Sequence, residues 1–564
     1  MSGSELQSHR DAHWLGWAAL AVFFSAWTAL WQHLNQGPPS WDDSWYLTDS
    51  LALYDALAKW GVGGWLRCYL FEVQERLRAP LICALPTPIY LVFGRHSNLA
   101  LAVNYLFIIL LFWSVHGIAR RFWGGRVALL AVFITGSLTE SFVLTNWYLV
   151  EYGLAAIVVA SIWCLIQSED LTRTRWVALF SVFCGLGMLQ KIVFPLYIGP
   201  LLVWCLARRV MRQGRSDSPS MAMTLAALVL PAAVIGGPWY LVNFRMVVGH
   251  AWLSGFSQEA DLYGTGNPFT LGAVRKYLLL VINEGIGAAY FCVAVAATAV
   301  WIALRCCGRR RASPQRDGYG KLVLALWAAP FLVFLFGHNK QVRFIAPILP
   351  VFAMVLAIAL SQIIETLGKW GWALTALLLL GAFAFLVQLC FEPLGVRNVV
   401  LWSDPSRPTD EMVGLHFLDP DMTVPPMYEA NPWPLLKTLQ DVIALRPRGP
   451  RKNYRVMTAS DSIHFNLNNL SLAAAQARLP VQVCTTAYYD DPALLRSDIR
   501  AMDFVLFRQN TEIPDLHYNK LQADALDEVK GDGLFDAIPS AIRFPDHGVL
   551  WIYRNKSLAP APPF

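Results

Sequence analysis

Long uncharged runs of hydrophobic residues dominate the first 390 positions of the chain. The first run, residues 14–32, contains no charged side chain over 19 positions, enough for a helix to cross about 30 Å of hydrocarbon. No small-residue cleavage site follows, so we expect an uncleaved anchor. Similar runs predict about eleven transmembrane helices in all. The other ten are 97–119, 127–146, 149–167, 176–190, 192–207, 221–244, 277–304, 321–337, 344–364 and 370–390.

The pattern changes after residue 390. Short extended runs such as 454–460, 481–489 and 502–508 alternate with a helical pattern at 471–479, which is typical of an α/β domain. The sequence therefore predicts a multi-pass α-helical membrane domain over 1–390 and a small α/β domain over 391–564. Residues 35–96 form the first long loop between predicted spans.

Charge follows the same division. Only 15% of the 564 residues are charged, against about 25% in soluble domains, which excludes a single soluble domain. Residues 1–390 hold 28 Lys or Arg and 18 Asp or Glu, whereas residues 391–564 hold 17 and 21. The asymmetry matches a membrane domain followed by a soluble one.

The positive-inside rule gives the orientation. With a cytoplasmic N-terminus, the inner loops contain 17 basic and 7 acidic residues, and the outer segments of 1–390 contain 11 of each. An odd number of spans then places residues 391–564 outside the cytoplasm, on the outer face of the cell (inner) membrane. The basic excess belongs to these loops, so we expect no nucleic-acid partner.

Ionisable residues near the predicted spans gather on the outer side. Placing such a group near the bilayer core costs about 2.5–3.5 kcal/mol, so their positions are informative. This clustering of carboxylates and cations indicates a site for a charged, membrane-borne substrate. The residues are Asp42, Asp43, Arg78, Glu140, Glu151, Lys191, Glu284, Lys340 and Arg343.

The first outer loop has the pattern of a surface helix. Asp42, Trp45, Tyr46 and Asp49 recur at helical spacing. Glycines within 61–64 are expected to end this helix, and a second surface helix would then lead toward Arg78-Ala79-Pro80-Leu81. A plain juxtamembrane helix with solvated acids is the simpler interpretation of this segment.

Six motifs in order resemble a known family. The chain is similar to polyprenyl-phosphate-sugar-dependent glycosyltransferases of the GT-C fold, the group of protein O-mannosyltransferases and lipid A aminoarabinose transferases. The resemblance spans about residues 14–390 and does not cover the region after 391. The matching elements are Asp42-Asp43-Ser44-Trp45-Tyr46, Arg78-Ala79-Pro80-Leu81 with the following Leu91-Val92-Phe93-Gly94, Glu151, Gly185 to Lys191, Pro238-Trp239-Tyr240-Leu241-Val242-Asn243, and Arg343-Phe344 through Pro347 and Pro350.

The resemblance implies transfer of a sugar from a polyprenyl-phosphate donor to an acceptor hydroxyl on a glycan, lipid or protein. It assigns the general base to Asp42, which implies inversion, with Asp43 replacing the more usual Glu. Glu151 would orient the acceptor or simply pair with a cation.

Cations are needed to stabilise the lipid phosphate as it leaves. Arg78, Lys340, Arg343 and Lys191 are the expected ligands, and Arg78 replaces the family's Lys. Interfacial snorkelling is the alternative for Arg78 and Arg343.

Some members of this group hold a divalent metal ion beside the first-loop acids. The carboxylate expected just before the turn is Leu77 here. Asp43, Glu75 and His338 are the remaining candidate ligands, and no other cofactor is implied.

Three other functions compete with this one. A transporter would explain many helices and buried charges, but it favours charges at the midplane and broken helices in two halves. A membrane scaffold would leave the grouping of Asp42, Arg78 and Arg343 unexplained. An enzyme transferring an oligosaccharide from a pyrophosphate lipid shares the same fold class and differs in the donor.

Overall fold

A computed structural model shows two compact units, each built from segments that are distant in sequence. The first, here called the membrane unit, comprises Met1–Gln32, Leu66–Ala84 and Leu101–Phe417. The second, the α/β unit, comprises His33–Trp65, Leu85–Ala100 and Leu418–Phe564. The structure describes residues 3–211, 220–256, 260, 264, 266–306, 317–391, 399–403, 412–415, 429–445, 453–487, 489–511, 519–531 and 533–557.

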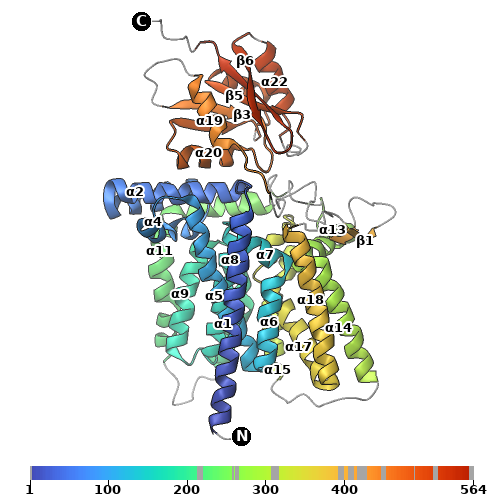
Figure 1. The fold of residues 1–564 in the computed structure, drawn as a ribbon. Coiled ribbons are helices and arrows are strands. Elements are labelled where there is room, and N and C mark those ends of the chain that lie inside the picture. Colours follow the sequence, from blue (N-terminus) through green and yellow to red (C-terminus); the bar gives the residue numbers. More distant parts are fainter. Residues whose placement is uncertain are drawn as a thin grey trace. The chain divides into compact units, whose positions relative to one another are not determined.

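The membrane unit is almost entirely helical (Figure 1). Its long helices run side by side because their apolar side chains face both each other and the hydrocarbon. Among the described residues of this unit, strands β1 (Val399–Ser403) and β2 (Met412–Leu415) pair antiparallel. The helices are α1 (Gly3–Leu34), η1 (Val73–Arg76), α3 (Leu81–Ala84), α5 (Ala102–Trp123), α6 (Gly125–Ser137), α7 (Thr139–Asn146), α8 (Val150–Gln167), α9 (Thr174–Gln190), α10 (Phe194–Met211), α11 (Met221–Phe256), α13 (Leu271–Leu280), η3 (Val281–Gly287), α14 (Ala288–Cys306), α15 (Asp317–Ala328), α16 (Phe331–Leu335), η4 (Val342–Ile345), α17 (Leu349–Leu367) and α18 (Lys369–Phe391).

Among the described residues, nine helical segments are long and apolar enough to span a membrane. The pair α6 and α7, bent by 61°, gives a tenth. The apolar helix α9 is shorter, at 17 residues. Each of the eleven predicted spans falls on one of these segments, so the multi-pass helical fold is confirmed.

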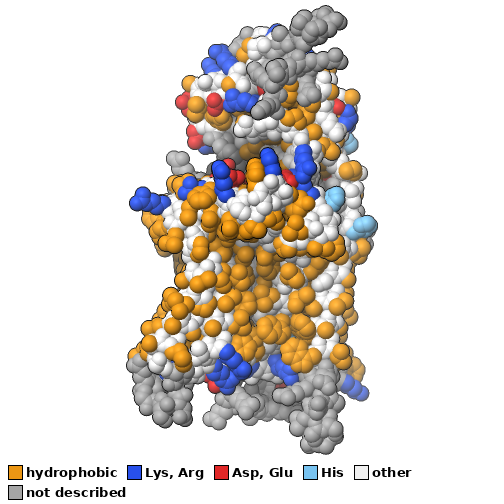
Figure 2. Space-filling model, turned by 90° about the vertical axis from the view of Figure 1, so that its left-hand side faces the viewer, with side chains coloured by type: hydrophobic (Ala, Val, Ile, Leu, Met, Phe, Trp, Pro, Cys, Tyr) orange, Lys and Arg blue, Asp and Glu red, His pale blue; other side chains and the backbone are white. Residues whose placement is uncertain are grey.

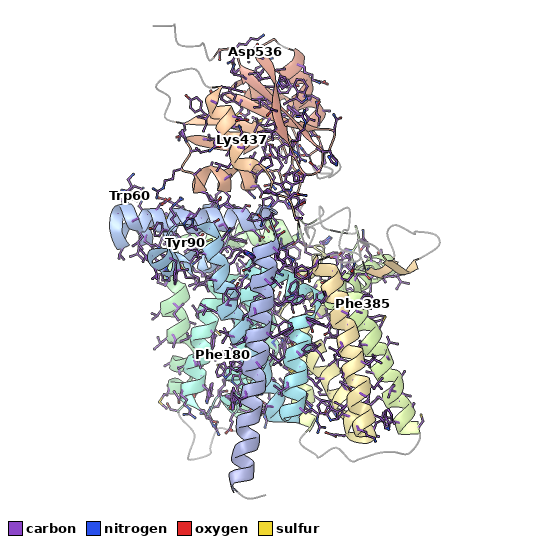
Figure 3. All side chains as sticks on the ribbon, in the orientation of Figure 1. Trp60, Tyr90, Phe180, Phe385, Lys437 and Asp536 are labelled. Atoms are coloured by element: carbon purple, nitrogen blue, oxygen red, sulfur yellow. The ribbon has the colours of Figure 1, made fainter. Side chains whose placement is uncertain are left out.

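Helix α8 lies at the centre of the membrane unit, with 89% of its residues buried, and it packs against α5, α9 and α10. Phe180 of α9 is fully buried, whereas Phe385 of α18 is 43% exposed (Figure 3). Figure 2 shows a broad band of hydrophobic side chains over the long helices, with Lys and Arg gathered at its lower edge. Such a continuous apolar surface is expected to face lipid, and the protein is therefore a membrane protein.

The first long loop forms α2 (Trp41–Phe71), whose residues up to Trp65 belong to the α/β unit. Gly61 breaks the helix with φ 67° and ψ −163°, a backbone conformation that favours glycine. The predicted break is thus confirmed. Helix α4 (Thr87–Phe93) packs under α2, where Tyr90 is buried and its hydroxyl lies 2.9 Å from the Ser50 hydroxyl (Figure 3).

The C-terminal part of the α/β unit is a three-layer sandwich, which confirms the predicted α/β fold. Its sheet has the order β4-β3-β5-β7-β6. Strands β3 (Tyr454–Thr458), β4 (Val481–Thr485) and β5 (Phe504–Gln509) are parallel. Strands β6 (Phe535–Arg543) and β7 (Val549–Asn555) are antiparallel.

Alternation along the strands builds one core on each face of this sheet. Val456 packs with α19 (Leu435–Ala444) and α20 (Leu467–Gln476). Its neighbour Met457 packs on the opposite face with α21 (Pro492–Arg500) and α22 (Gln522–Gly531).

A buried histidine makes the stability of this sandwich depend on pH. His464 is 2% exposed and its ring lies 4.8 Å from the Trp433 ring. Burial, and secondarily the Arg508 charge, lower the pKa of His464 from 6.5 to about 3. The folded domain therefore holds His464 neutral, while the unfolded chain takes up a proton below about pH 6.5.

Stability of the sandwich is expected to fall as the pH drops from about 6.5 toward 3, by at most about 1.4 kcal/mol per pH unit from this residue. Replacing His464 with Phe keeps an aromatic ring but removes the proton, so this part of the pH dependence should disappear. Hydrogen exchange of β3 and β5 in the full-length protein measures it. An unchanged acid profile in the variant would contradict the assignment.

Candidate functional site

A buried carboxylate organises charges at one end of the membrane unit. Glu151 stands in the first turn of α8 and is 1% exposed. Lys191 Nζ donates to Glu151 Oε1 at 2.5 Å, and Arg343 Nε lies 3.6 Å from the same oxygen. The dipole of α8 also favours an anion in this turn. One carboxylate therefore holds two cations beside each other.

The local backbone conformation positions Lys191 and Arg343 beside Glu151. Helix α9 stops at Gln190 because Lys191 is extended, with φ −162° and ψ 135°. The Lys191 ammonium then lies 4.4 Å from the centre of the Phe344 ring. Arg343 sits in the 3₁₀ turn η4, and its Nε donates to Gln341 Oε1 at 2.8 Å.

Arg78 follows an unusual left-handed turn. Gln74, Glu75 and Arg76 have φ values of 54°, 49° and 67°, a conformation that costs non-glycine residues free energy and often marks functional sites. Asn243 of α11 holds the turn: its Oδ1 accepts from Arg76 Nε at 2.7 Å and its Nδ2 donates to the Leu70 carbonyl at 2.9 Å.

The Arg78 charge lies within electrostatic range of Lys191, and Arg78 Nε lies 3.5 Å from His250 Nε2. The membrane unit thus brings together Arg78, Glu151, Lys191 and Arg343, which are separated by up to 265 positions in the sequence. We call these four residues the cation cluster.

Lys340 takes a neighbouring position on the loop before η4. It is 3% exposed, donates to the Leu335 carbonyl at 2.6 Å and lies 5.1 Å from the centre of the Tyr277 ring. Burial lowers the pKa of Lys340 from its ordinary value. Lys340 therefore contacts an aromatic ring next to the cluster.

Two further carboxylates from the predicted outer-side group, Glu140 and Glu284, belong to the same region. Glu140, in the first turn of α7, is 2% exposed and interacts electrostatically with Glu284, Glu151 and Arg343. Glu284 lies in η3, a π-helical segment that packs against α7 and η4. Such segments often occur at functional sites. The glycines at 285 and 287 were the available sequence signal.

Asp42 and Asp43 open α2 in the α/β unit. Asp43 is 3% exposed and Asp42 is partly exposed, so the two carboxylates face different surroundings. Their neighbours Trp41 and Ser44 bond to Asp461 and Asn469. The convergence of Asp42 with the cation cluster stays a prediction.

The three candidate metal ligands do not form a metal-binding group. Within the described part of the chain, no three His, Cys, Asp or Glu side chains lie together as a metal would require. Glu75 is exposed on η1, His338 is partly buried, and Asp43 belongs to the α/β unit. We therefore derive no step through a metal.

The architecture is that of the GT-C fold, as comparison with known proteins shows. Residues 78–236 match the model of the dolichyl-phosphate-mannose-protein mannosyltransferase family. This segment includes Arg78, Glu151 and Lys191, and the predicted resemblance is confirmed. No curated protein sequence matches the chain.

Solved structures support the same fold. ArnT from Cupriavidus metallidurans bound to undecaprenyl phosphate is 15% identical with a TM-score of 0.55, covering 96% of this chain and 99% of ArnT. AglB, the oligosaccharyltransferase of Archaeoglobus fulgidus, in complex with an inhibitory peptide and a dolichol-phosphate, is 12% identical with a TM-score of 0.52, covering 98% and 75%. The mycobacterial arabinofuranosyltransferase AftD is 14% identical with a TM-score of 0.50, covering 94% and 40%.

Gly287 allows η3 to approach α7, and its replacement provides a test of the site's architecture. Its φ is +87°, and a Cβ atom there would lie 2.4 Å from Thr139 Oγ1. Gly287→Ala should destabilise the protein by at least about 1–2 kcal/mol, because a side chain is disfavoured at this φ and η3 must also shift. Thermal unfolding in detergent measures this loss.

Gly272→Ala is the matched control, since an added Cβ at Gly272 of α13 meets nothing within 4 Å. Equal melting temperatures for the two variants would contradict the close packing of η3 on α7.

Proposed function

We propose that the protein transfers one sugar from a polyprenyl-phosphate donor to an acceptor hydroxyl at the extracytoplasmic membrane surface. The observation that carries this proposal is the cation cluster. Lys191 and Arg343 both contact Glu151, and the Arg78 charge lies within electrostatic range of Lys191, so three cations gather near helix ends where an anion can bind. A lipid phosphate supplies that anion, and the structurally similar ArnT was solved with undecaprenyl phosphate.

The cluster would act on the leaving group. As the glycosidic bond breaks, negative charge grows on the lipid phosphate, and preorganised cations stabilise that charge most in the transition state. Glu151 keeps Lys191 and Arg343 in place before the donor arrives. Arg78 and Arg343 would donate paired N–H bonds to phosphate oxygens, and Lys340 would add charge from the adjacent loop.

Asp42 would accept the proton of the attacking hydroxyl, a role typically worth 10²–10⁴-fold in rate. Direct displacement by that hydroxyl inverts the anomeric carbon. Asp43 is more deeply buried than Asp42, so its carboxylate would support the structure of the first turn of α2. Glu151 would instead pair with Lys191 and Arg343. The acceptor would be a glycan, lipid or protein.

Two alternative functions, a transporter and an oligosaccharide transferase, make different demands on the site. The cation cluster lies at the start of α8, the end of α9 and the turn before α17, which favours a surface site over the midplane site of a transporter. Transfer of an oligosaccharide from a pyrophosphate lipid remains the second candidate, because the A. fulgidus oligosaccharyltransferase shares the fold. The positive-inside bias supports a cytoplasmic N-terminus in either case.

Asp42→Asn should abolish sugar transfer, a loss of at least about 100-fold, while the protein still inserts and folds. The amide cannot accept the acceptor's proton. The measurement is transfer from a panel of radiolabelled prenyl-phosphate sugars into membrane extracts. Asp49→Asn, on the same helix, is the matched control and should stay active; full activity in Asp42→Asn would remove the proposed base.

Arg343→Ala should weaken binding of undecaprenyl phosphate about 10- to 100-fold, since a charge-assisted hydrogen bond contributes about 1.5–3 kcal/mol. Native mass spectrometry of the detergent-solubilised protein measures the affinity. The control is Arg126→Ala, which removes an exposed arginine paired with Glu365 at 3.4 Å. This variant should bind undecaprenyl phosphate with unchanged affinity. Unchanged binding in Arg343→Ala would instead support a snorkelling role.

A further inference from the structure

The start of α2 is bonded to the sandwich within the α/β unit. Trp41 Nε1 donates to Asp461 Oδ1 at 3.0 Å, and Ser44 Oγ donates to Asn469 Oδ1 at 2.7 Å. Asn468 Nδ2 donates to the Trp41 carbonyl at 2.9 Å. These three bonds hold Trp41 and Ser44, the residues immediately before and after Asp42 and Asp43.

The partners of α2 are themselves rigidly held. Asn466 caps α20 by accepting from the backbone N–H groups of Asn468 and Asn469, each at 3.0 Å. Asn466 Nδ2 donates to the Ser462 carbonyl at 3.0 Å, and Asn469 Nδ2 donates to the Ile463 carbonyl at 3.2 Å. Asn466 and Asn469 are at most 1% exposed. The loop after β3 therefore presents fixed hydrogen-bonding groups.

A second contact lies further along α2 and α20. Arg95 binds Asp55 of α2 with two bonds of 2.8 and 2.6 Å and also donates to the Ala475 carbonyl of α20 at 3.1 Å. Arg478 Nη2 reaches Asp55 Oδ1 at 3.1 Å. Contacts at two separated points prevent α2 from turning about its own axis.

That rotation decides where Asp42 points. Successive residues of a helix project about 100° apart, so a modest turn of α2 would move the Asp42 carboxylate away from its acceptor. Ser44 is buried and its hydroxyl donates to Asn469 Oδ1 at 2.7 Å, so a rotation of α2 would break this bond. The bonds near Asp42 are thus suited to orientation as well as to stability.

We propose that α20 and the loop before it act as a clamp that sets the orientation of Asp42, with Asp461 and Asn469 as positioning residues. The inference rests on the proposed function, because it requires Asp42 to be the base. It assigns to the C-terminal domain a role in catalysis that needs no contact with the sugar.

Kinetics separate positioning from simple stabilisation. Asn469→Ala and Asp461→Ala in the full-length protein should lower kcat about 10- to 100-fold, as expected when a base is misplaced. KM for the prenyl-phosphate sugar and binding of undecaprenyl phosphate should stay within about twofold. Asp461→Asn keeps an oxygen that accepts from Trp41, so it should restore most of the kcat. Lys437→Ala, in an exposed pair with Asp441, is the matched control.

A double-mutant cycle tests the buried bond itself. Ser44→Ala and Asn469→Ala remove the same hydrogen bond, so their effects on kcat should not add. Additive effects would overturn the clamp, as would normal kcat in both alanine variants at Asp461 and Asn469.

A physical measurement is independent of activity. Asn469→Ala should speed hydrogen exchange in the first turn of α2, measured by peptide mass spectrometry, because it removes the bond from Ser44, and unchanged exchange there would overturn the docking. Asp42→Asn assayed in parallel distinguishes the two proposals. Lost transfer in Asp42→Asn with normal kcat in Asn469→Ala overturns only the clamp, whereas normal transfer in Asp42→Asn overturns the base and the clamp with it.

Discussion

The charge balance around Glu151 is the constraint on which the rest of the membrane unit depends. An unpaired carboxylate buried among apolar helices would cost several kcal/mol, and so would each cation next to it. The bond from Lys191 and the nearby Arg343 guanidinium offset this cost for Glu151. The same arrangement holds Lys191 and Arg343 beside each other, where we propose that a lipid phosphate binds.

Irregular backbone brings the partners of Glu151 into range. Each of the three cations lies at or next to a break in regular helix. Lys191 is at the extended end of α9, Arg343 is in the 3₁₀ turn η4, and Arg78 follows the left-handed turn of η1. Asn243 of α11 accepts a hydrogen bond from Arg76 in η1 and donates one to the Leu70 carbonyl just before it, which illustrates how a neighbouring helix compensates for such a break. The site is therefore built from connections, while the long helices supply a rigid frame.

Sequence patterns predicted the helices and strands better than the tertiary contacts between them. Hydrophobic runs identified all eleven spans, and the glycines at 61–64 identified the break in α2, because hydrophobic length and glycine conformation are local properties. The motifs around Arg78, Glu151, Lys191 and Arg343 anticipated residues that do lie together. The assignment of α2 to the α/β unit, the π-helical setting of Glu284 and the role of Asn243 depend on tertiary contacts, which leave no local signal.

The most direct test of the account locates a lipid phosphate on the protein. A polyprenyl phosphate carrying a photoreactive group next to its phosphate would be cross-linked to the membrane-embedded protein, and the labelled peptides identified. The account predicts labelling of the segments that contain Arg78, Lys191 and Arg343, with competition by unmodified undecaprenyl phosphate. Labelling confined to the lipid-facing surfaces of α11 and α18, without competition, would contradict it.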